Sequence, residues 1–246
     1  MKWLPPALLD TRAPMRLFCL PYAGGGASAY RMWAAALRSD VQLCAVQLPG
    51  RENRLGEPLY TSASDLVPAL VEAMRPFLDR PYAIFGHSMG GLLAFEAARR
   101  MRRLGLPAPR QLFISSHRAP HLTDRSTQVH RLGRAEFIDA LRNLHGTPEE
   151  VLANEELMQI AEPVLRADFQ LCETYVYTAD DPLEMPMNVF GGANDPDVTE
   201  GDLRPWSEHT RATTAVRMFP GHHLYVRDAR EPLVRAINHA MGGSAN

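Results

Sequence analysis

Short apolar runs recur along the first half of the chain and end at proline, glycine or polar turn residues. Four of them are MRLFCL (15–20), VQLCAV (41–46), YAIFGH (82–87) and QLFISS (111–116). Such runs are typical of strands buried on both faces of a sheet. Apolar residues at helical spacing separate them, over residues 28–38, 62–78 and 89–104. Strands that alternate with helices predict βαβ units and a mainly parallel sheet.

The same alternation returns near the end of the chain. Strand patterns cover residues 187–191 and 215–219, and helical patterns cover 202–209 and 231–241. A parallel crossover needs only about a dozen residues, so the long stretch between residues 116 and 186 predicts an insertion.

The inserted stretch is itself helical. One apolar face consists of Phe137, Ile138, Leu141 and Leu144, and a second, which follows Asn154, consists of Leu157, Ile160, Ala161, Val164 and Leu165. Thr147 is predicted to cap a helix that begins at Pro148, and Pro163 is predicted to bend the following one. We therefore predict an N-terminal tail (1–14), an α/β core (15–116 and 182–246) and an α-helical lid (117–181).

Composition and charge exclude several classes of protein. Of the 246 residues 46% are hydrophobic and 22% charged, as in ordinary globular proteins and unlike fibrous or disordered ones. The formal net charge of -2 provides no basic field for nucleic acid. The chain has no apolar run of about 18 residues, and prolines interrupt the N-terminus, where a secretory signal would lie. We expect a cytoplasmic protein with no nucleic-acid or membrane partner.

The cysteines and histidines do not predict a metal site. Cys19, Cys44 and Cys172 are odd in number and have neither CxxC nor zinc-ligand spacing. They are expected to be free thiols in a reducing compartment. We expect neither a metal nor a cofactor.

The strongest local motif is Gly86-His87-Ser88-Met89-Gly90, a GxSxG placed between a strand pattern and a helix pattern. A tight strand-to-helix turn needs glycine at these positions and lifts the serine hydroxyl out of the sheet. This context favours Ser88 as a nucleophile over an incidental serine in a glycine-rich turn.

A serine nucleophile needs a base and an acid that orients the base. In hydrolases with this elbow the acid and then the base follow later strands. Asp195 and His223 fit that order, with Asp197 and His222 as alternatives on the same two loops. The other histidines are predicted to be structural, and His87 is predicted to pack under the elbow. These are His87, His117, His121, His130, His145, His209 and His239.

An acyl-transfer transition state also needs two N–H donors for its oxyanion. The backbone N–H of Met89, directly after the nucleophile, is one candidate. Ala23, in the glycine-rich loop after the first strand, is the other. This loop has neither a G-x-G-x-x-G motif nor a Lys-Ser/Thr pair, so a phosphate-cradling role is disfavoured.

Two groups of charged residues remain open between structural and functional interpretations. Arg99, Arg100, Arg102 and Arg103 suit a solvated helix C-terminus, or alternatively a docking surface for an acidic partner. Arg51, Glu52 and Arg54 are interpreted as residues that hold their loop together by ion pairs.

These motifs resemble those of the external, type II thioesterases of polyketide and nonribosomal peptide synthesis. The resemblance covers about residues 15–237. It is carried by LPYAGGGASAY, QLPGRENRLGEP, IFGHSMGG, PVLRADFQLCETYVY, FGGANDPDV and FPGHHLYV. It implies an α/β-hydrolase fold, and it implies Ser88, Asp195 and His223 as the catalytic triad with Ala23 and Met89 as the oxyanion hole.

The resemblance also implies a substrate. Enzymes of this kind release aberrant or stalled acyl groups from the phosphopantetheine thiol of acyl or peptidyl carrier proteins. One departure is that Gly221-His222-His223 stands where the family commonly has Gly-Gly-His. Two other functions stay open: a carboxylesterase for small esters, and a hydrolase-fold binding protein without catalysis.

Overall fold

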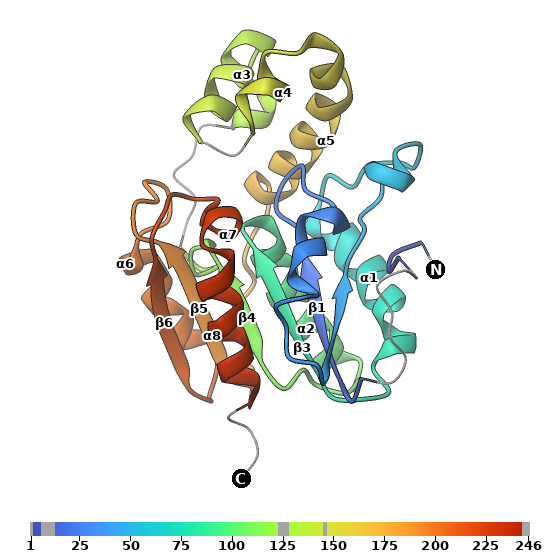
Figure 1. The fold of residues 1–246 in the computed structure, drawn as a ribbon, viewed down its shortest axis with the longest axis vertical. Coiled ribbons are helices and arrows are strands. Elements are labelled where there is room, and N and C mark those ends of the chain that lie inside the picture. Colours follow the sequence, from blue (N-terminus) through green and yellow to red (C-terminus); the bar gives the residue numbers. More distant parts are fainter. Residues whose placement is uncertain (1, 6–12, 123–127, 145–146, 243–246) are drawn as a thin grey trace.

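The computed structural model describes residues 2–5, 13–122, 128–144 and 147–242. Within these ranges six parallel strands form one sheet in the order β2-β1-β3-β4-β5-β6 (Figure 1). The strands are β1 (Met15–Leu20), β2 (Val41–Ala45), β3 (Tyr82–His87), β4 (Leu112–Ser115), β5 (Met187–Gly192) and β6 (Thr214–Phe219). The predicted bounds of β1 and β3 are confirmed. The other four strands differ from the prediction by one residue at one or both ends.

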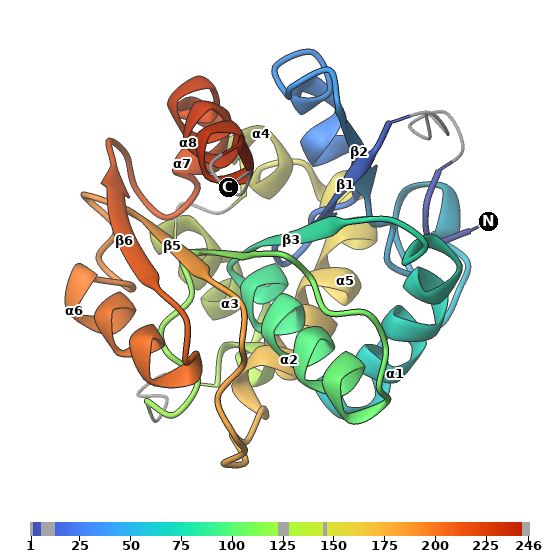
Figure 2. The same cartoon turned by 90° about the horizontal axis from the view of Figure 1, so that it is seen from below.

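Helices cover both faces of the sheet. The α-helices are α1 (Ala63–Met74), α2 (Met89–Arg103), α3 (Arg134–Asn143), α4 (Glu149–Leu152), α5 (Glu155–Glu173), α6 (Glu200–Leu203), α7 (Tyr225–Asp228) and α8 (Arg230–Gly242). The 3₁₀ segments are η2 (Ala27–Trp33), η3 (Glu52–Arg54), η4 (Arg75–Phe77), η5 (Val129–Arg131) and η6 (Arg204–His209). In Figure 2, α1, α2 and α6 lie on one face of the sheet, and α7 and α8 lie on the other.

Two hydrophobic clusters fill the spaces between the sheet and these helices. β3 and β4 are buried along their whole length, which explains their unbroken apolar runs. β6, at the edge of the sheet, instead alternates between half-buried and exposed residues over most of its length.

Two predicted helices take a different form. The predicted helix over 28–38 is the 3₁₀ segment η2, whose buried residues Ala27, Tyr30 and Trp33 recur every three positions. That repeat matches the period of a 3₁₀ helix. The predicted helix over 202–209 is divided between α6 and η6.

The segment between β4 and β5 contains α3, α4 and α5, as its pattern predicts. Figure 1 shows α3 and α4 standing clear of the sheet, with α5 leading back toward it. A small core of its own joins these helices, and it includes the buried Phe137, Leu141, Met158 and Leu165. The predicted second face is partly wrong, because Leu157 and Ile160 are 44% and 53% exposed.

The predicted cap of α4 is also wrong. The helix begins one residue later than expected, with Pro148 in the N-cap position and no side-chain cap. Pro148, rather than Thr147, therefore occupies the N-cap position. Because a proline side chain has no oxygen that could accept a hydrogen bond, α4 has no side-chain cap. Asn154, in contrast, caps α5 by accepting a hydrogen bond from the backbone N–H of Leu157 at 3.1 Å.

The N-terminal residues that the structure describes contact the core. Leu4 is buried, and the carbonyl oxygen of Trp3 accepts a hydrogen bond from the backbone N–H of Gln47 at 2.8 Å. Arg54 lies over the Trp3 ring, 4.5 Å from its centroid. Residues 2–5 are therefore held in place, whereas the sequence pattern suggests a loose tail.

The strand order places two loops side by side at the carboxyl ends of the strands. β1 lies between β2 and β3, so the chain leaves β1 toward one side of the sheet and leaves β3 toward the other. Such a switch point opens a crevice at the carboxyl edge of a parallel sheet. The glycine-rich loop after β1 and the GxSxG turn after β3 meet there.

Candidate active site

Ser88 lies in the turn between β3 and α2 with a backbone φ of 53° and ψ of -119°. This conformation is uncommon for a residue with a side chain and is found at functional sites. Two close contacts of the backbone around Ser88 impose this conformation. A Cβ on Gly86 would lie 1.9 Å from the carbonyl oxygen of Gly90, and one on Gly90 would lie 2.2 Å from that of Leu20. Only glycine fits at either position, as the motif predicts.

His223 lies beside Ser88. Its Nε2 is 2.9 Å from Ser88 Oγ, and its Nδ1 is 2.8 Å from Asp195 Oδ2. Asp195 follows β5 and His223 follows β6, so two neighbouring strands supply the pair. The structure thus brings the predicted acid, base and nucleophile into one row of hydrogen bonds.

The Asp195 side chain is fully buried yet charged. Burial raises its pKa, but three hydrogen bonds to the carboxylate, together with the charge of His223, outweigh that effect and the pKa lies below its usual value. One comes from His223, and the backbone N–H groups of Asp197 and Val198 donate the others to Asp195 Oδ1, at 3.0 and 3.2 Å. The carboxylate can therefore hold the imidazole in one orientation.

The two alternative residues lie elsewhere in the same loops. Asp197 is exposed and contacts Asp195 only through its backbone N–H. His222 is exposed as well, and its Nδ1 lies 2.9 Å from the carbonyl oxygen of Asn194. The geometry favours Asp195 and His223 over both.

Ala23 lines the same cavity as Ser88, and Met89 directly follows Ser88 in the chain. Met89 is the first residue of α2, where backbone N–H groups have no partner within the helix. Ala23 lies in a turn that the backbone N–H of Gly25 closes by donating to the carbonyl oxygen of Tyr22 at 2.9 Å. The N–H groups of Ala23 and Met89 are the candidate oxyanion donors.

A small cavity of about 130 Å³ opens beside Ser88 and His223. Its apolar wall includes Leu141 of α3 and Leu165, Phe169 and Cys172 of α5. An outer cavity of about 370 Å³ adjoins it and shares four lining residues with it. The outer cavity runs along the glycine-rich loop and is lined by Arg51, Glu52, Ile160 and Arg227, among others.

His87 is buried beneath the elbow, as predicted. Its Nδ1 lies 2.8 Å from Ser115 Oγ, which in turn lies 2.5 Å from the hydroxyl of Tyr225. Burial, together with the neighbouring charge of His223, lowers the pKa of His87 far below its usual value. His87 therefore stays neutral and supports the turn from below.

Among the described residues no group of three or more His, Cys, Asp or Glu side chains could hold a metal ion. Several histidines predicted to be structural make internal contacts. His121 Nδ1 lies 2.7 Å from His209 Nε2, and His130 forms an ion pair with Glu173. His145 lies outside the described residues.

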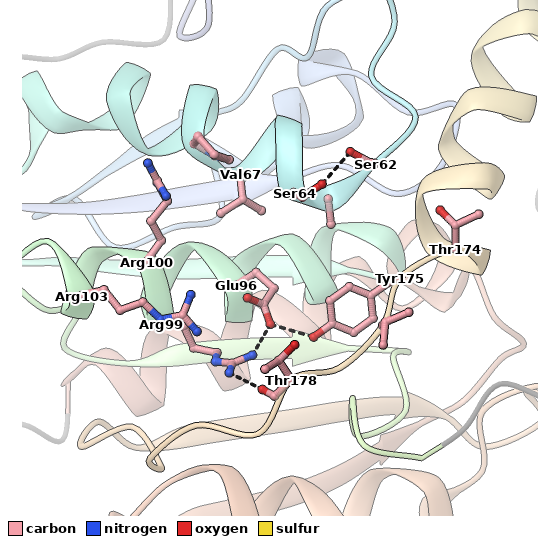
Figure 3. Close-up of a pocket in the computed structure, with 13 residues that line it drawn as sticks. Ser62, Ser64, Val67, Glu96, Arg99, Arg100, Arg103, Thr174, Tyr175 and Thr178 are labelled. Atoms are coloured by element: carbon pink, nitrogen blue, oxygen red, sulfur yellow. Dashed lines mark hydrogen bonds and ion pairs between the residues drawn. The ribbon is translucent and has the colours of Figure 1, made fainter.

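Three arginines near the end of α2, Arg99, Arg100 and Arg103, line a cavity of about 440 Å³ (Figure 3). Ser88 is not among the residues that line it. Arg99 is buried, which corrects the prediction of a solvated helix end for this residue, whereas Arg103 is exposed as predicted. It donates to Glu96 Oε1 and to the carbonyl oxygen of Thr178, both at 2.5 Å. Arg102 and Arg103 form ion pairs with Asp180 at 2.8 Å. Docking of an acidic partner at this end stays a prediction.

The charged residues after β2 make contacts within the protein, as the ion-pair interpretation predicts. Arg51 pairs with Asp168 and Arg54 pairs with Glu57, each at 2.6 Å. Glu52 accepts a hydrogen bond from Ser28 at 2.6 Å. The sequence patterns did not single out Asp168, which lies within the motif PVLRADFQLCETYVY.

Comparison with known proteins decides the family. The model of the thioesterase domain matches residues 15–241 of the chain. The chain belongs to the thioesterase family. This thioesterase is 41% identical over 233 residues to the gramicidin S biosynthesis protein GrsT of Aneurinibacillus migulanus, a match that covers 95% of this chain and 91% of GrsT.

Two further comparisons agree with this thioesterase assignment over nearly the whole length. The protein named linear gramicidin dehydrogenase LgrE, of Brevibacillus parabrevis, is 42% identical over 243 residues, 98% of this chain and 92% of LgrE. The type II thioesterase BorB from the borrelidin biosynthetic cluster superposes with a TM-score of 0.89 at 36% identity, over 97% of both chains. Although LgrE is named a dehydrogenase, the family match and the Ser88–His223–Asp195 row indicate hydrolytic chemistry here.

The predicted resemblance to type II thioesterases and the predicted α/β-hydrolase fold are thus confirmed. None of the helices in the described ranges combines the length and the apolar character needed to cross a bilayer.

Proposed function

We propose that this thioesterase hydrolyses acyl groups from the phosphopantetheine thiol of acyl or peptidyl carrier proteins, through an acyl intermediate on Ser88. The observation that carries the proposal is the hydrogen-bonded row of Ser88, His223 and Asp195 at the wall of an apolar cavity. The likeness to BorB, a type II thioesterase of a biosynthetic cluster, supports release of stalled or aberrant acyl groups as the task.

The geometry supports a two-step reaction. Ser88 Oγ attacks the thioester carbonyl while His223 Nε2 takes the hydroxyl proton, and the backbone N–H groups of Ala23 and Met89 stabilise the oxyanion. When the carbon–sulfur bond breaks, His223 returns the proton to the leaving sulfur. A water molecule then attacks the acyl-serine with His223 as its base, which releases the carboxylic acid and restores Ser88.

The two adjoining cavities suit the two parts of this substrate. The small cavity has the volume of about four water molecules, which is room for a short acyl chain. The outer cavity leads from it along the glycine-rich loop toward Arg227 and can hold the pantetheine arm. Because α3 and α5 line the acyl site, and α4 and α5 line its entrance, we propose that the segment 117–181 acts as the lid.

The deciding experiment compares three substrate formats that bear the same acyl group: the loaded carrier protein, acyl-pantetheine and a simple oxygen ester. We expect kcat/KM to be highest for the carrier protein and lowest for the ester. Ser88→Ala is the control for background hydrolysis. A higher kcat/KM for the oxygen ester than for either thioester would instead identify a carboxylesterase. Failure of a fluorophosphonate to label Ser88 would indicate a binding protein without catalysis.

A further inference from the structure

The glycine-rich loop that carries Ala23 is a type II β-turn. Tyr22 and Gly25 are its ends, and of the two central residues only Gly24 has a positive φ, 73°. The hydrogen bond from Gly25 to Tyr22 holds the peptide plane that contains the Ala23 N–H. The next plane, between Ala23 and Gly24, could reverse and convert the turn to type I unless a second contact holds it.

Asp168 of α5 makes that second contact. Its Oδ2 accepts a hydrogen bond from the backbone N–H of Gly24 at 2.7 Å. Leu165, one helical turn earlier, packs so closely that a Cβ on Gly24 would lie 2.6 Å from its Cδ2. The orientation of the peptide after Ala23 therefore depends on a helix about 140 residues away in sequence.

Arg51 holds the carboxylate in turn. Its two terminal nitrogens lie 2.6 and 2.9 Å from the two oxygens of Asp168, and it also donates to the carbonyl oxygen of Gly25 at 3.3 Å. The side chains of Arg51 and Asp168 are 7% and 2% exposed. A bidentate pair fixes its geometry more strictly than a single ion pair does. It also neutralises a carboxylate that would otherwise repel an oxyanion formed at Ala23.

We propose that Asp168 is a positioning residue for the oxyanion loop and that Arg51 keeps it in place, so that the position of α5 controls the conformation of the turn that carries the Ala23 N–H. The proposal rests on the proposed function, because this N–H matters only if an oxyanion forms beside it. The pair joins three elements: the turn after β1, the loop after β2 and α5. A displaced α5 leaves Gly24 without its acceptor, and catalysis then falls while Ser88, His223 and Asp195 keep their contacts.

The test is Asp168→Asn, which keeps the shape of the side chain but cannot accept hydrogen bonds from Gly24 and from both nitrogens of Arg51. Loss of one oxyanion donor lowers kcat by about 10²–10³-fold, so a misaligned donor should lower it by about 10–100-fold. We expect that loss in kcat per Ser88 titrated with a fluorophosphonate, with KM changed less than about threefold. The rate of Ser88 phosphonylation should fall in parallel, because that reaction also builds charge on an oxygen.

Glu173→Gln is the matched control. Glu173 lies on the same helix and its side chain is 6% exposed. It accepts hydrogen bonds from the backbone N–H groups of Val129 and His130, away from the glycine-rich loop. The Glu173→Gln variant should have a lower melting temperature and an unchanged kcat per titrated serine. If Asp168→Asn behaves like Glu173→Gln, with kcat per site within about twofold of wild type, the pair is only structural and the proposal is wrong.

Arg51→Lys keeps the charge but not the bidentate geometry, and it decides the question if Asp168→Asn does not fold. A loss of about 3–10-fold in kcat per titrated serine supports the positioning role, whereas wild-type kcat overturns it. The phosphonylation rate needs no carrier protein. Failure of the proposed substrate would therefore appear as absent thioester turnover in the wild type, whereas failure of the positioning role would appear as unchanged phosphonylation in the variants.

Discussion

Ser88 combines a half-buried reactive side chain with a backbone that its neighbours force to a positive φ. Such a conformation costs about 1–3 kcal/mol and persists only where the surroundings impose it. Here Gly86 and Gly90 allow the contacts that do so. The strain lies in the backbone, so replacing the side chain with another small one should leave the turn intact.

Ser88→Ala should therefore abolish thioester hydrolysis without unfolding the protein, because it removes the nucleophile and opens no large cavity. The residual kcat should be below about a hundredth of wild type, since loss of a triad serine normally costs far more. Steady-state hydrolysis measures the effect, and an unchanged melting temperature is the control. A purified variant that keeps more than that fraction would show that Ser88 is not the nucleophile.

The two adjacent histidines after β6 allow a direct comparison. His223→Ala should cost about as much kcat as Ser88→Ala, because residues that act as a unit lose their effect together. His222→Ala should cost little, since its ring contacts the carbonyl oxygen of Asn194 rather than Ser88. Parallel kcat measurements on both variants provide the check. The reverse ranking would transfer the role of base to His222.

At the scale of elements, two phenylalanines of the segment between β4 and β5 have different surroundings. Phe137 is fully buried in the small core of that segment, with Arg166 lying 4.1 Å from its ring centroid. Phe169 packs against that core but also lines the small cavity beside Ser88. Phe137 should therefore contribute to the stability of the fold, and Phe169 should contribute to the preference for acyl length.

Phe169→Ala should enlarge the small cavity and shift the preference for acyl length toward longer chains. Phe137→Ala should instead destabilise the fold by about 3–5 kcal/mol, as truncation of a buried phenylalanine usually does, with the acyl-length profile retained. Values of kcat/KM across a series of acyl lengths, with melting temperatures for both variants, separate the two effects. A profile unchanged in folded Phe169→Ala would mean that the core loops, rather than the proposed lid, set specificity.

The elements also show how far sequence patterns could predict this structure. Strands such as β3 are evident because a strand buried on both faces is apolar throughout. The pattern over 28–38 failed because a repeat of three and a repeat of 3.6 are hard to distinguish within two turns. The prediction for Leu157 and Ile160 failed for another reason. Both are apolar and at helical spacing, yet they lie on an exposed part of α5, where Ile160 lines the outer cavity.

For the whole molecule, two buried histidines connect stability to pH. Burial is the main cause that lowers the pKa of His87, and it lowers that of His209 to about 4, with help from the charges of His121 and Arg99. The unfolded chain, with ordinary histidine pKa values near 6.5, therefore binds more protons than the folded one below about pH 6.5. The free energy of unfolding must fall as pH decreases from about 6.5 to 4.

His209→Gln should flatten this dependence. The amide does not titrate and can still donate a hydrogen bond to His121. A difference of about 2.5 pKa units corresponds to about 3 kcal/mol, so the wild type should lose up to that amount more than the variant between pH 7 and 4. Urea unfolding at several pH values measures it, with His222→Gln as an exposed control. Identical slopes in wild type and His209→Gln would contradict the assignment.

The sequence predicts the reactive residues of the candidate site more fully than the residues that hold them in position. Ser88, Asp195 and His223 each follow a recognisable strand, so the order of the motifs along the chain narrowed the candidates to three loops. Within two of those loops it left Asp197 and His222 as alternatives. Asp168 has no such marker, because its partners Gly24 and Arg51 come from distant loops that only the folded sheet brings together. Contacts of that kind depend on three-dimensional packing and leave no periodic trace in the sequence.

The strand order also affects when the enzyme becomes active. Ser88 lies in the first half of the chain, but Asp195 and His223 follow the last two strands, which join the sheet only after the long segment beyond β4 has been made. Closing so long a loop carries an entropy cost before any contact repays it. A nascent chain that ends before β6 therefore displays a serine without a base. Such a chain cannot cleave thioesters, so catalytic competence and completion of the sheet arrive together.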